Sequence, residues 1–165
     1  MLLLWAFLLI VTGCGASAGL AGSSGTVAAS TAAGDPVKVA ALRAAYDLEG
    51  SERAVVFLAV TGATDTEYAE IADALFEALD VDVVPAEQAD RASPDLPALT
   101  PVDPETGAVG VSLTLLEVTP VDEERFEATV RYARSGLDGG ELSLTVAPGD
   151  DGAWAVTEYA HGSIG

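Results

Sequence analysis

The sequence is poor in several chemically versatile residues. Its 165 residues include one cysteine, Cys14, one lysine, Lys38, and one histidine, His161. A single cysteine can form no intrachain disulfide, so the fold must be held by packing alone. Zinc sites draw most of their ligands from cysteine and histidine, and one residue of each leaves only carboxylates to complete such a site. We therefore expect neither a metal site nor a cofactor.

Positive charge is also scarce. Seven lysine and arginine residues face 26 acids, which gives a net charge of −19. A chain this acidic repels nucleic acids, so no nucleic-acid partner is expected. The acids are spread along the chain, and with the many alanines, valines and glycines this composition resembles proteins of salt-loving or high-GC bacteria. The alternative is a cation-binding protein, but no D-x-D-x-D-G loop occurs. The stretch 149–152, GDDG, is more typical of a hairpin turn.

Motifs for catalysis are missing as well. The sequence has no G-x-S-x-G, no Walker loop and no dinucleotide-binding glycine fingerprint. Neighbouring acids, such as Asp65 with Glu67 or Asp80 with Asp82, arise by chance in a chain with 26 acids. No catalytic residue is assigned, and a non-enzymatic protein is predicted.

The N-terminus carries the most specific motif. Residues 2–11, LLLWAFLLIV, are apolar throughout. A spanning helix needs roughly 20 such residues, whereas the h-region of a signal peptide is this short. The following Val11-Thr12-Gly13-Cys14 resembles the lipobox of bacterial lipoproteins, although no lysine or arginine precedes the apolar run. The resemblance implies cleavage before Cys14 and lipidation of its thiol. The alternatives are an ordinary secretory signal with an incidental cysteine, or a poorly packed N-terminal helix.

The composition divides the chain into three parts. Residues 1–13 are the expected signal peptide. Residues 14–34 hold Cys14 and an uncharged tract rich in glycine, alanine and serine, which is typical of a flexible tether. Residues 35–165 have the usual length of one domain. The lipobox implies an exported protein attached to a bacterial membrane through its lipid. Gly15 after the cysteine favours the outer membrane, if the host has one.

Periodicity in the domain predicts two helices and a strand before a sheet. Asp35 as N-cap and Pro36 at the first helical position begin a helix that ends near Gly50. The apolar run 54–60 predicts a buried strand. A capping box, Thr64-x-x-Glu67, begins a second helix that continues to Leu79. Residues 82–107 contain five prolines and are expected to be irregular, apart from a short strand near 81–84.

From residue 109 the pattern alternates with period two. Four runs, 111–118, 125–134, 141–148 and 153–160, are separated by turn-like stretches and predict a four-stranded antiparallel meander. Large apolar residues fall on even numbers in the last three runs, so adjacent strands must pair with even residue sums. In the first run the apolar positions change from odd to even. Either a β-bulge lies near Leu115-Leu116 or both faces there are covered.

The predicted fold class is α+β, with two helices packed on an antiparallel sheet that ends in the meander. The element order resembles that of cystatin-like and NTF2-like folds. The C-terminal pattern also resembles a group of uncharacterised bacterial lipoproteins, a resemblance that names no activity. On the polar face of the meander we expect Arg131 opposite Thr145, Ser143 opposite Thr157 and Glu141 opposite Tyr159. The candidate binding face comprises Arg131, Glu141, Ser143, Thr157, Tyr159 and His161.

Two functions remain open. The first is a membrane-anchored, non-enzymatic domain that binds an unknown protein or small molecule or acts in the cell envelope. The second is an enzyme with a carboxylate-lined pocket in a cone-shaped fold. A pocket of about 300 Å³ or more in which an acid and a second polar group converge would favour the enzyme.

Overall fold

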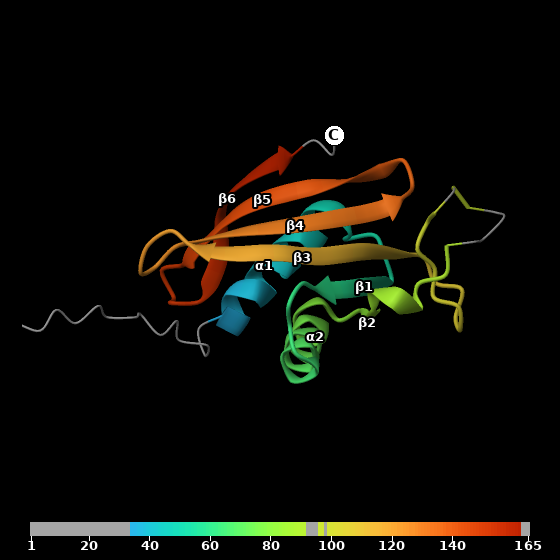
Figure 1. The fold of residues 1–165 in the computed structure, drawn as a ribbon, viewed down its shortest axis with the longest axis horizontal. Helices are drawn as coiled ribbons and strands as arrows, with labels where there is room; N and C mark the ends of the chain where they lie inside the picture. Colours follow the sequence, from blue (N-terminus) through green and yellow to red (C-terminus); the bar gives the residue numbers. More distant parts are fainter. Residues whose placement is uncertain (1–33, 92–95, 98, 163–165) are drawn as a thin grey trace, which may run out of the picture.

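The computed structural model describes residues 34–91, 96–97 and 99–162 (Figure 1). Nearly all of the predicted signal peptide, lipobox and tether lies outside the described residues. The described elements follow the order α1 (Gly34–Glu49), β1 (Val55–Val60), α2 (Asp65–Leu79), β2 (Asp82–Pro85), the 3-10 turn η1 (Ala86–Gln88), β3 (Gly110–Pro120), β4 (Phe126–Ser135), β5 (Asp138–Pro148) and β6 (Trp154–Gly162). The fold is α+β, as the sequence predicts.

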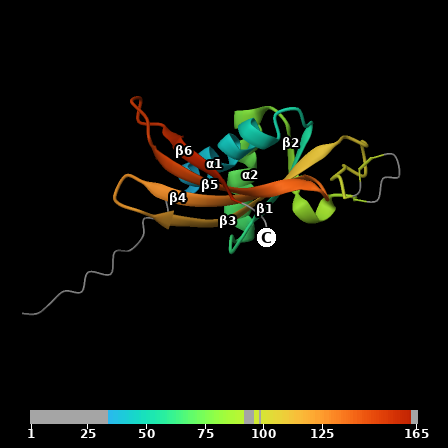
Figure 2. The ribbon, with the colours of Figure 1, turned by 90° about the horizontal axis from the view of Figure 1, so that it is seen from above.

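The described strands form one sheet in the order β2-β1-β3-β4-β5-β6, and both α-helices lie on the same side of it (Figure 2). The four strands from β3 to β6 form the predicted antiparallel meander. The rest of the sheet differs from the prediction, since β1 pairs in parallel with both β2 and β3. Helix α2 joins β1 to β2, and such a crossover returns the chain to the starting end of the sheet, which makes the two strands parallel.

Local signals set the helix ends. Thr64 caps α2, and its Oγ1 accepts a hydrogen bond from the backbone N–H of Glu67 at 3.3 Å, which confirms the predicted capping interaction. Helix α1 begins at Gly34, one residue before the predicted cap. Lys38 of α1 and Glu67 of α2 form an ion pair between the helices. The hydroxyl of Tyr68 donates to the carbonyl of Leu58 in β1 at 3.5 Å, and burial raises the pKa of this phenol to about 12.

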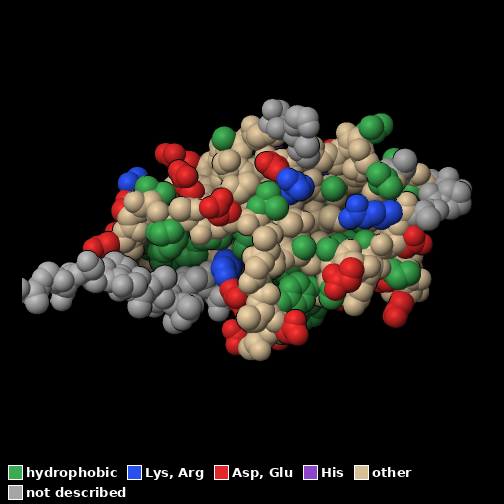
Figure 3. Space-filling view, viewed as in Figure 1, with side chains coloured by type: hydrophobic (Ala, Val, Ile, Leu, Met, Phe, Trp, Pro, Cys, Tyr) green, Lys and Arg blue, Asp and Glu red, His purple; other side chains and the backbone are tan. Residues whose placement is uncertain are grey.

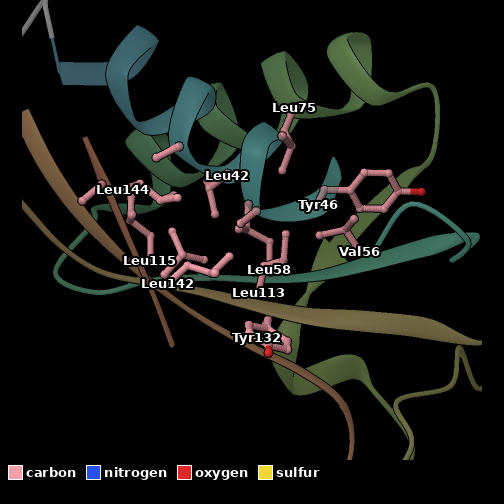
Figure 4. Packing of buried hydrophobic residues seen from close by; sticks show 14 of the residues in the cluster. Leu42, Tyr46, Val56, Leu58, Leu75, Leu113, Leu115, Tyr132, Leu142 and Leu144 are labelled. Atoms are coloured by element: carbon pink, nitrogen blue, oxygen red, sulfur yellow. The ribbon is translucent and has the colours of Figure 1, made fainter. Parts of the chain in front are cut away.

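The main core lies between the helices and the sheet (Figure 4). Leu42 and Tyr46 of α1 and Leu75 of α2 meet side chains that project from four strands, β1, β3, β4 and β5. The strand residues labelled in the figure are Val56, Leu58, Leu113, Leu115, Tyr132, Leu142 and Leu144. Because these side chains are almost completely buried, this layer supplies most of the apolar burial that stabilises the fold.

The opposite face of β1 is buried as well. Val55 and Phe57 alternate with the core residues Val56 and Leu58, yet both are at most 1% exposed. Beyond β2, η1 contacts β1, and Val102 is buried and bridges to Asp90 and Val109. Because both faces of β1 are buried, the strand is apolar without alternation.

The register shifts at three places in the meander, one of them between Ala133 and Ser135, where β4 pairs with β5. The register between β3 and β4 shifts between Leu115 and Glu117, which confirms the bulge predicted near Leu115-Leu116. A second bulge lies between β5 and β6, where Val146 pairs with Val156 but Thr145 pairs with Glu158. Thr157 is the extra residue. A bulge changes which face the following side chains occupy.

Candidate functional site

Strand β6 forms one edge of the sheet and leaves its outer backbone groups available. It extends from Trp154 to Gly162 and pairs with β5 on one side only. Among the described residues, no strand pairs with its other side. The opposite edge of the sheet is β2, a short strand that ends at Pro85. The sheet therefore has one long open edge and one short edge.

The second bulge divides the side chains of β6 differently from the sequence prediction. Trp154 and Val156 lie on the helix side of the sheet, opposite Pro148 and Val146. Beyond Thr157 the parity reverses, and Tyr159 and His161 lie opposite Leu144 and Leu142, again on the helix side. The predicted placement of Tyr159 and His161 on the polar face is therefore wrong.

The candidate binding face is only partly assembled. Arg131 lies directly opposite Glu141, not opposite Thr145, and its Nη2 is 2.6 Å from Glu141 Oε1. Ser143 lies between Thr129 and Ala160. Since Arg131, Glu141 and Ser143 share the face away from the helices, the structure keeps these three together.

The other predicted pairs fail at the second bulge. Ser143 does not face Thr157, and Glu141 faces Gly162 instead of Tyr159. Thr157 sits within the bulge and donates from its Oγ1 to the carbonyl of Thr145 at 3.3 Å. Sequence parity cannot detect a bulge whose inserted residue is a small polar side chain, because the apolar pattern of β6 is already weak there.

On the helix side, ionisable side chains from four elements meet at the end of α1. Glu49 of α1, Arg134 of β4, Asp138 of β5 and His161 of β6 form the Glu49 cluster. The Glu49 side chain is only 9% exposed, and its Oε2 lies 3.4 Å from Arg134 Nη1 while its Oε1 lies 3.6 Å from His161 Nδ1. Arg134 Nη2 also donates to Asp138 Oδ1 at 2.7 Å. The cluster thus links the end of α1 to three strands.

The surroundings of Arg134 favour its charge. Its guanidinium lies 5.8 Å from the centre of the Tyr132 ring, within range of a cation–π interaction. The hydrogen bond to Asp138 raises the pKa of Arg134 above its usual value. Burial, followed by the charge of Glu49, raises the pKa of Tyr132. Arg134 therefore stays cationic, and Tyr132 stays neutral beside it. Arg134 Nε is buried without a hydrogen-bond partner among the described residues.

A polar hollow of about 360 Å³ adjoins this cluster. It is lined by Leu48, Glu49, Gly50, Ser51, Glu52, Arg53, Arg134 and Asp138. Its volume meets the size expected of an enzyme pocket, and acids and arginines do converge in it. Glu49 and Asp138 both form ion pairs with Arg134 beside this hollow.

A second depression, the apolar groove, lies at the other end of α1. It measures about 460 Å³ and runs between α1, α2 and the start of β6. Its lining residues are Pro36, Val39, Ala40, Arg43, Glu70, Ala74, Ala78, Ala153 and Trp154. The polar hollow and the apolar groove therefore mark opposite ends of α1, and β6 reaches from one to the other.

Glu49 and Arg134 were not singled out from the sequence, although Arg134 carried a signal. Its even number continues the apolar positions of its strand, from Phe126 to Tyr132, and so predicts the helix side of the sheet. An arginine on a buried face requires an acidic partner. The sequence cannot identify which of 26 acids supplies it, because that depends on where the end of α1 packs.

No family model matches the chain, and neither a curated protein nor a solved structure matches it. Within the described part of the chain, no helix is both long and apolar enough to span a membrane. The same residues contain no group of three or more histidine, cysteine or acidic side chains placed to hold a metal ion.

Proposed function

We propose that the protein is an exported lipoprotein, anchored through Cys14, whose domain binds a protein partner at the membrane surface without catalysing a reaction. The open edge of β6 carries this proposal, since it offers backbone donors and acceptors beside two depressions of opposite character. Unpaired strand edges are natural sites of association. The lipobox-like sequence and the tether support the anchored location.

The tether suits a domain that must reach a partner. The tract before α1 has the composition of a flexible chain, and about 20 residues of such a chain are expected to span about 25 Å on average. The acidic domain is repelled by anionic lipid surfaces, so the anchor holds it near the membrane while its charge keeps it off the lipid. The open edge then stays accessible.

The anchor is tested by replacing Cys14 with alanine. A single acyl chain binds membranes marginally, whereas several chains hold stably, so the variant should move from the membrane fraction to the soluble fraction or remain unprocessed. Fractionation of cells followed by intact-mass measurement provides both readouts. Equal membrane association of processed protein with and without the thiol would contradict the anchor.

Partner binding is tested by placing a photo-crosslinking amino acid in the chain in cells. Ala160 is exposed on β6, and Glu127 is exposed on β4, two strands inward. We expect a discrete crosslinked product, identified by mass spectrometry, from position 160 and much less from position 127. Crosslinks of equal yield at both positions, or none at 160, would contradict a partner at this edge.

The polar hollow favours a second candidate, an enzyme that uses Glu49 and His161. These two functions separate in a complementation experiment with a strain that lacks the protein. If the hollow is catalytic, Glu49→Gln should abolish complementation while the crosslink from position 160 persists. If the protein only binds, variants should lose complementation only when they also lose the crosslink from position 160.

A further inference from the structure

We infer that β6 accepts an extended, basic peptide segment of a partner protein as a seventh strand. The segment would place apolar side chains at the Trp154 end and lysine or arginine at the His161 end. This inference rests on the proposed partner binding and specifies its geometry and chemistry. It combines the open edge, the apolar groove and the Glu49 cluster.

The two sheet edges differ in their protection against added strands. Proteins usually protect edges with short strands, proline, charged side chains or bulges. β2 is short and ends in Pro85, whereas β6 extends over nine residues without proline or lysine and carries only the bulge at Thr157 and the charge of Glu158. Among the described residues its outer side has no strand partner. An extended peptide can therefore form main-chain hydrogen bonds along β6, as in other cases of β-strand addition.

The position of α1 determines what an added strand would meet. The start of β6 lies at the apolar groove with Pro36, Val39 and Ala40, which belong to the first half of α1. The end of β6 contacts Glu49, the last residue of α1, through His161. β6 thus runs alongside α1 in the same direction. Figures 1 and 2 show α1 on the same side of the sheet as α2.

A strand beside β6 would consequently follow α1 from one depression to the other. Its side chains on the helix side would approach the apolar groove near Trp154 and the polar hollow near His161. Alternate positions of an extended chain share one face, so apolar and charged residues would occupy every second position. This spacing makes the peptide preference specific.

Charge distinguishes the possible occupants. The hollow has three acids, Glu49, Glu52 and Asp138, against Arg53 and Arg134. The end of α1 also contributes the negative end of its helix dipole. A basic segment complements this surface. A second copy would instead bring two chains of charge −19 together along their β6 edges.

The test uses the full chain purified in detergent and a capped synthetic peptide of the same nine-residue length as β6. In the probe, every second residue is threonine. The residues between the threonines are valine toward one end and arginine toward the other. A second probe has the reversed order, because the peptide could add in either direction. Control peptides contain glutamate for arginine, serine for valine, or N-methyl groups at alternate amides.

Amide hydrogen exchange identifies strand addition directly. We expect one arginine probe to bind saturably and to slow exchange of β6 amides by about tenfold or more, since their outward N–H groups gain acceptors. The glutamate control should bind at least about tenfold more weakly, and the N-methyl control should give no protection. The serine control should bind more weakly than the probe.

A matched pair of variants tests the charged end. Glu52 lines the polar hollow, and Glu123 is equally exposed in the turn between β3 and β4. Glu52→Lys should weaken binding of the arginine probe about tenfold, whereas Glu123→Lys makes the same change in net charge and should have little effect. Equal weakening by both variants would reduce the binding to general attraction and overturn the inference.

Other outcomes would overturn it too. Binding of the N-methyl control, or protection confined to other strands, would exclude addition at β6. The amides of β6 could instead be protected already without peptide. If light scattering then shows a monomer, a segment of the same chain fills the edge; if it shows a dimer, a second copy fills it. A crosslink from position 160 without any peptide-induced protection would leave the proposed binding function intact and refute strand addition alone.

Discussion

At the residue scale, Arg134 and Arg131 provide a natural comparison, because both are on β4 and each contacts a carboxylate. Arg134 contacts Glu49, whose side chain is 9% exposed, while the Arg131 side chain is 51% exposed in its pair with Glu141. Burial decides what each pair contributes. Removing one partner leaves a buried charge unsatisfied in the first case and a solvated charge in the second.

Arg134→Met should therefore lower the free energy of unfolding by about 2 kcal/mol or more, since the carboxylate of Glu49 loses its cation. Arg131→Met should cost less than about 1 kcal/mol. Denaturant unfolding of both variants measures the difference. Adding Glu49→Gln to Arg134→Met should recover part of the loss, and no recovery would mean that the buried charge is not the cause.

Two glycines form a second comparison at this scale. A Cβ atom at Gly110 would lie 2.4 Å from Phe57 Cε2 and 2.7 Å from the carbonyl oxygen of Val55. Gly107 has open space around it, but its φ of +73° disfavours other residues. Gly110→Ala should cost about 3 kcal/mol through overpacking, and Gly107→Ala about 1 kcal/mol through backbone strain. Equal costs in thermal unfolding would show that Phe57 relaxes away.

At the scale of the elements, the sequence predicts most of the secondary structure because local signals specify it. The Thr64 cap, the apolar stripe of α2 and the turns of the meander all act within a few residues. The parallel pairing of β1 with β2 and β3 is not local, since Val55 pairs with Asp82 and with Gly110. The continuous apolar run of β1 does not by itself specify the direction in which its two neighbours run.

The candidate site was harder to predict for the same reason. Parity correctly placed Arg131, Glu141 and Ser143 together, but one inserted residue at Thr157 moved Tyr159 and His161 to the other face. The Glu49 cluster depends on the packing of the end of α1 against three strands. Contacts of this kind follow from the assembled fold and not from any one segment.

The ion pair between Lys38 and Glu67 predicts a dependence of stability on pH. The hydrogen bond from Lys38, the largest cause, lowers the pKa of Glu67 below its ordinary value of 4.5. A lowered folded-state pKa means that the stabilisation is complete above pH 4.5 and is lost as the pH falls through the lower value. The sole lysine of the chain therefore joins the two helices most firmly near neutral pH.

Lys38→Met should flatten this loss of stability below pH 4.5, the ordinary pKa of the carboxyl, and cost up to about 1 kcal/mol at pH 7. Urea unfolding at a series of pH values provides the measurement. Arg43→Met is the control, since its pair with Asp47 lies within one helix and both side chains are at least 60% exposed. An unchanged pH profile in Lys38→Met would assign the acid sensitivity to other carboxylates.

At the scale of the whole molecule, charge dominates. Acidic side chains are distributed over the whole of the face shown in Figure 3, not gathered in one patch. A surface of this kind repels itself, and dissolved salt screens the repulsion. The composition therefore has a physical consequence whether or not the organism lives in brine.

Added sodium chloride should raise the melting temperature, mostly as the Debye length falls from about 30 Å to about 3 Å. Differential scanning calorimetry from low to molar salt tests this. A melting temperature that does not change with salt would count against self-repulsion. A steep increase with micromolar calcium, at constant ionic strength, would instead indicate a cation site.

The parallel pairing of β1 with β3 also has a consequence for the order of events during synthesis. β1 can pair with β3 only after Gly110, which pairs with Val55, has left the ribosome. Until then α1, β1, α2 and β2 lack the meander that covers their shared apolar surface. Long-range pairing of this kind slows folding, because the entropy cost of closing a large loop is incurred before the stabilising contacts form. A chain that completes its core so late would suit the proposed export, since a chain must be unfolded to pass through a narrow translocation channel.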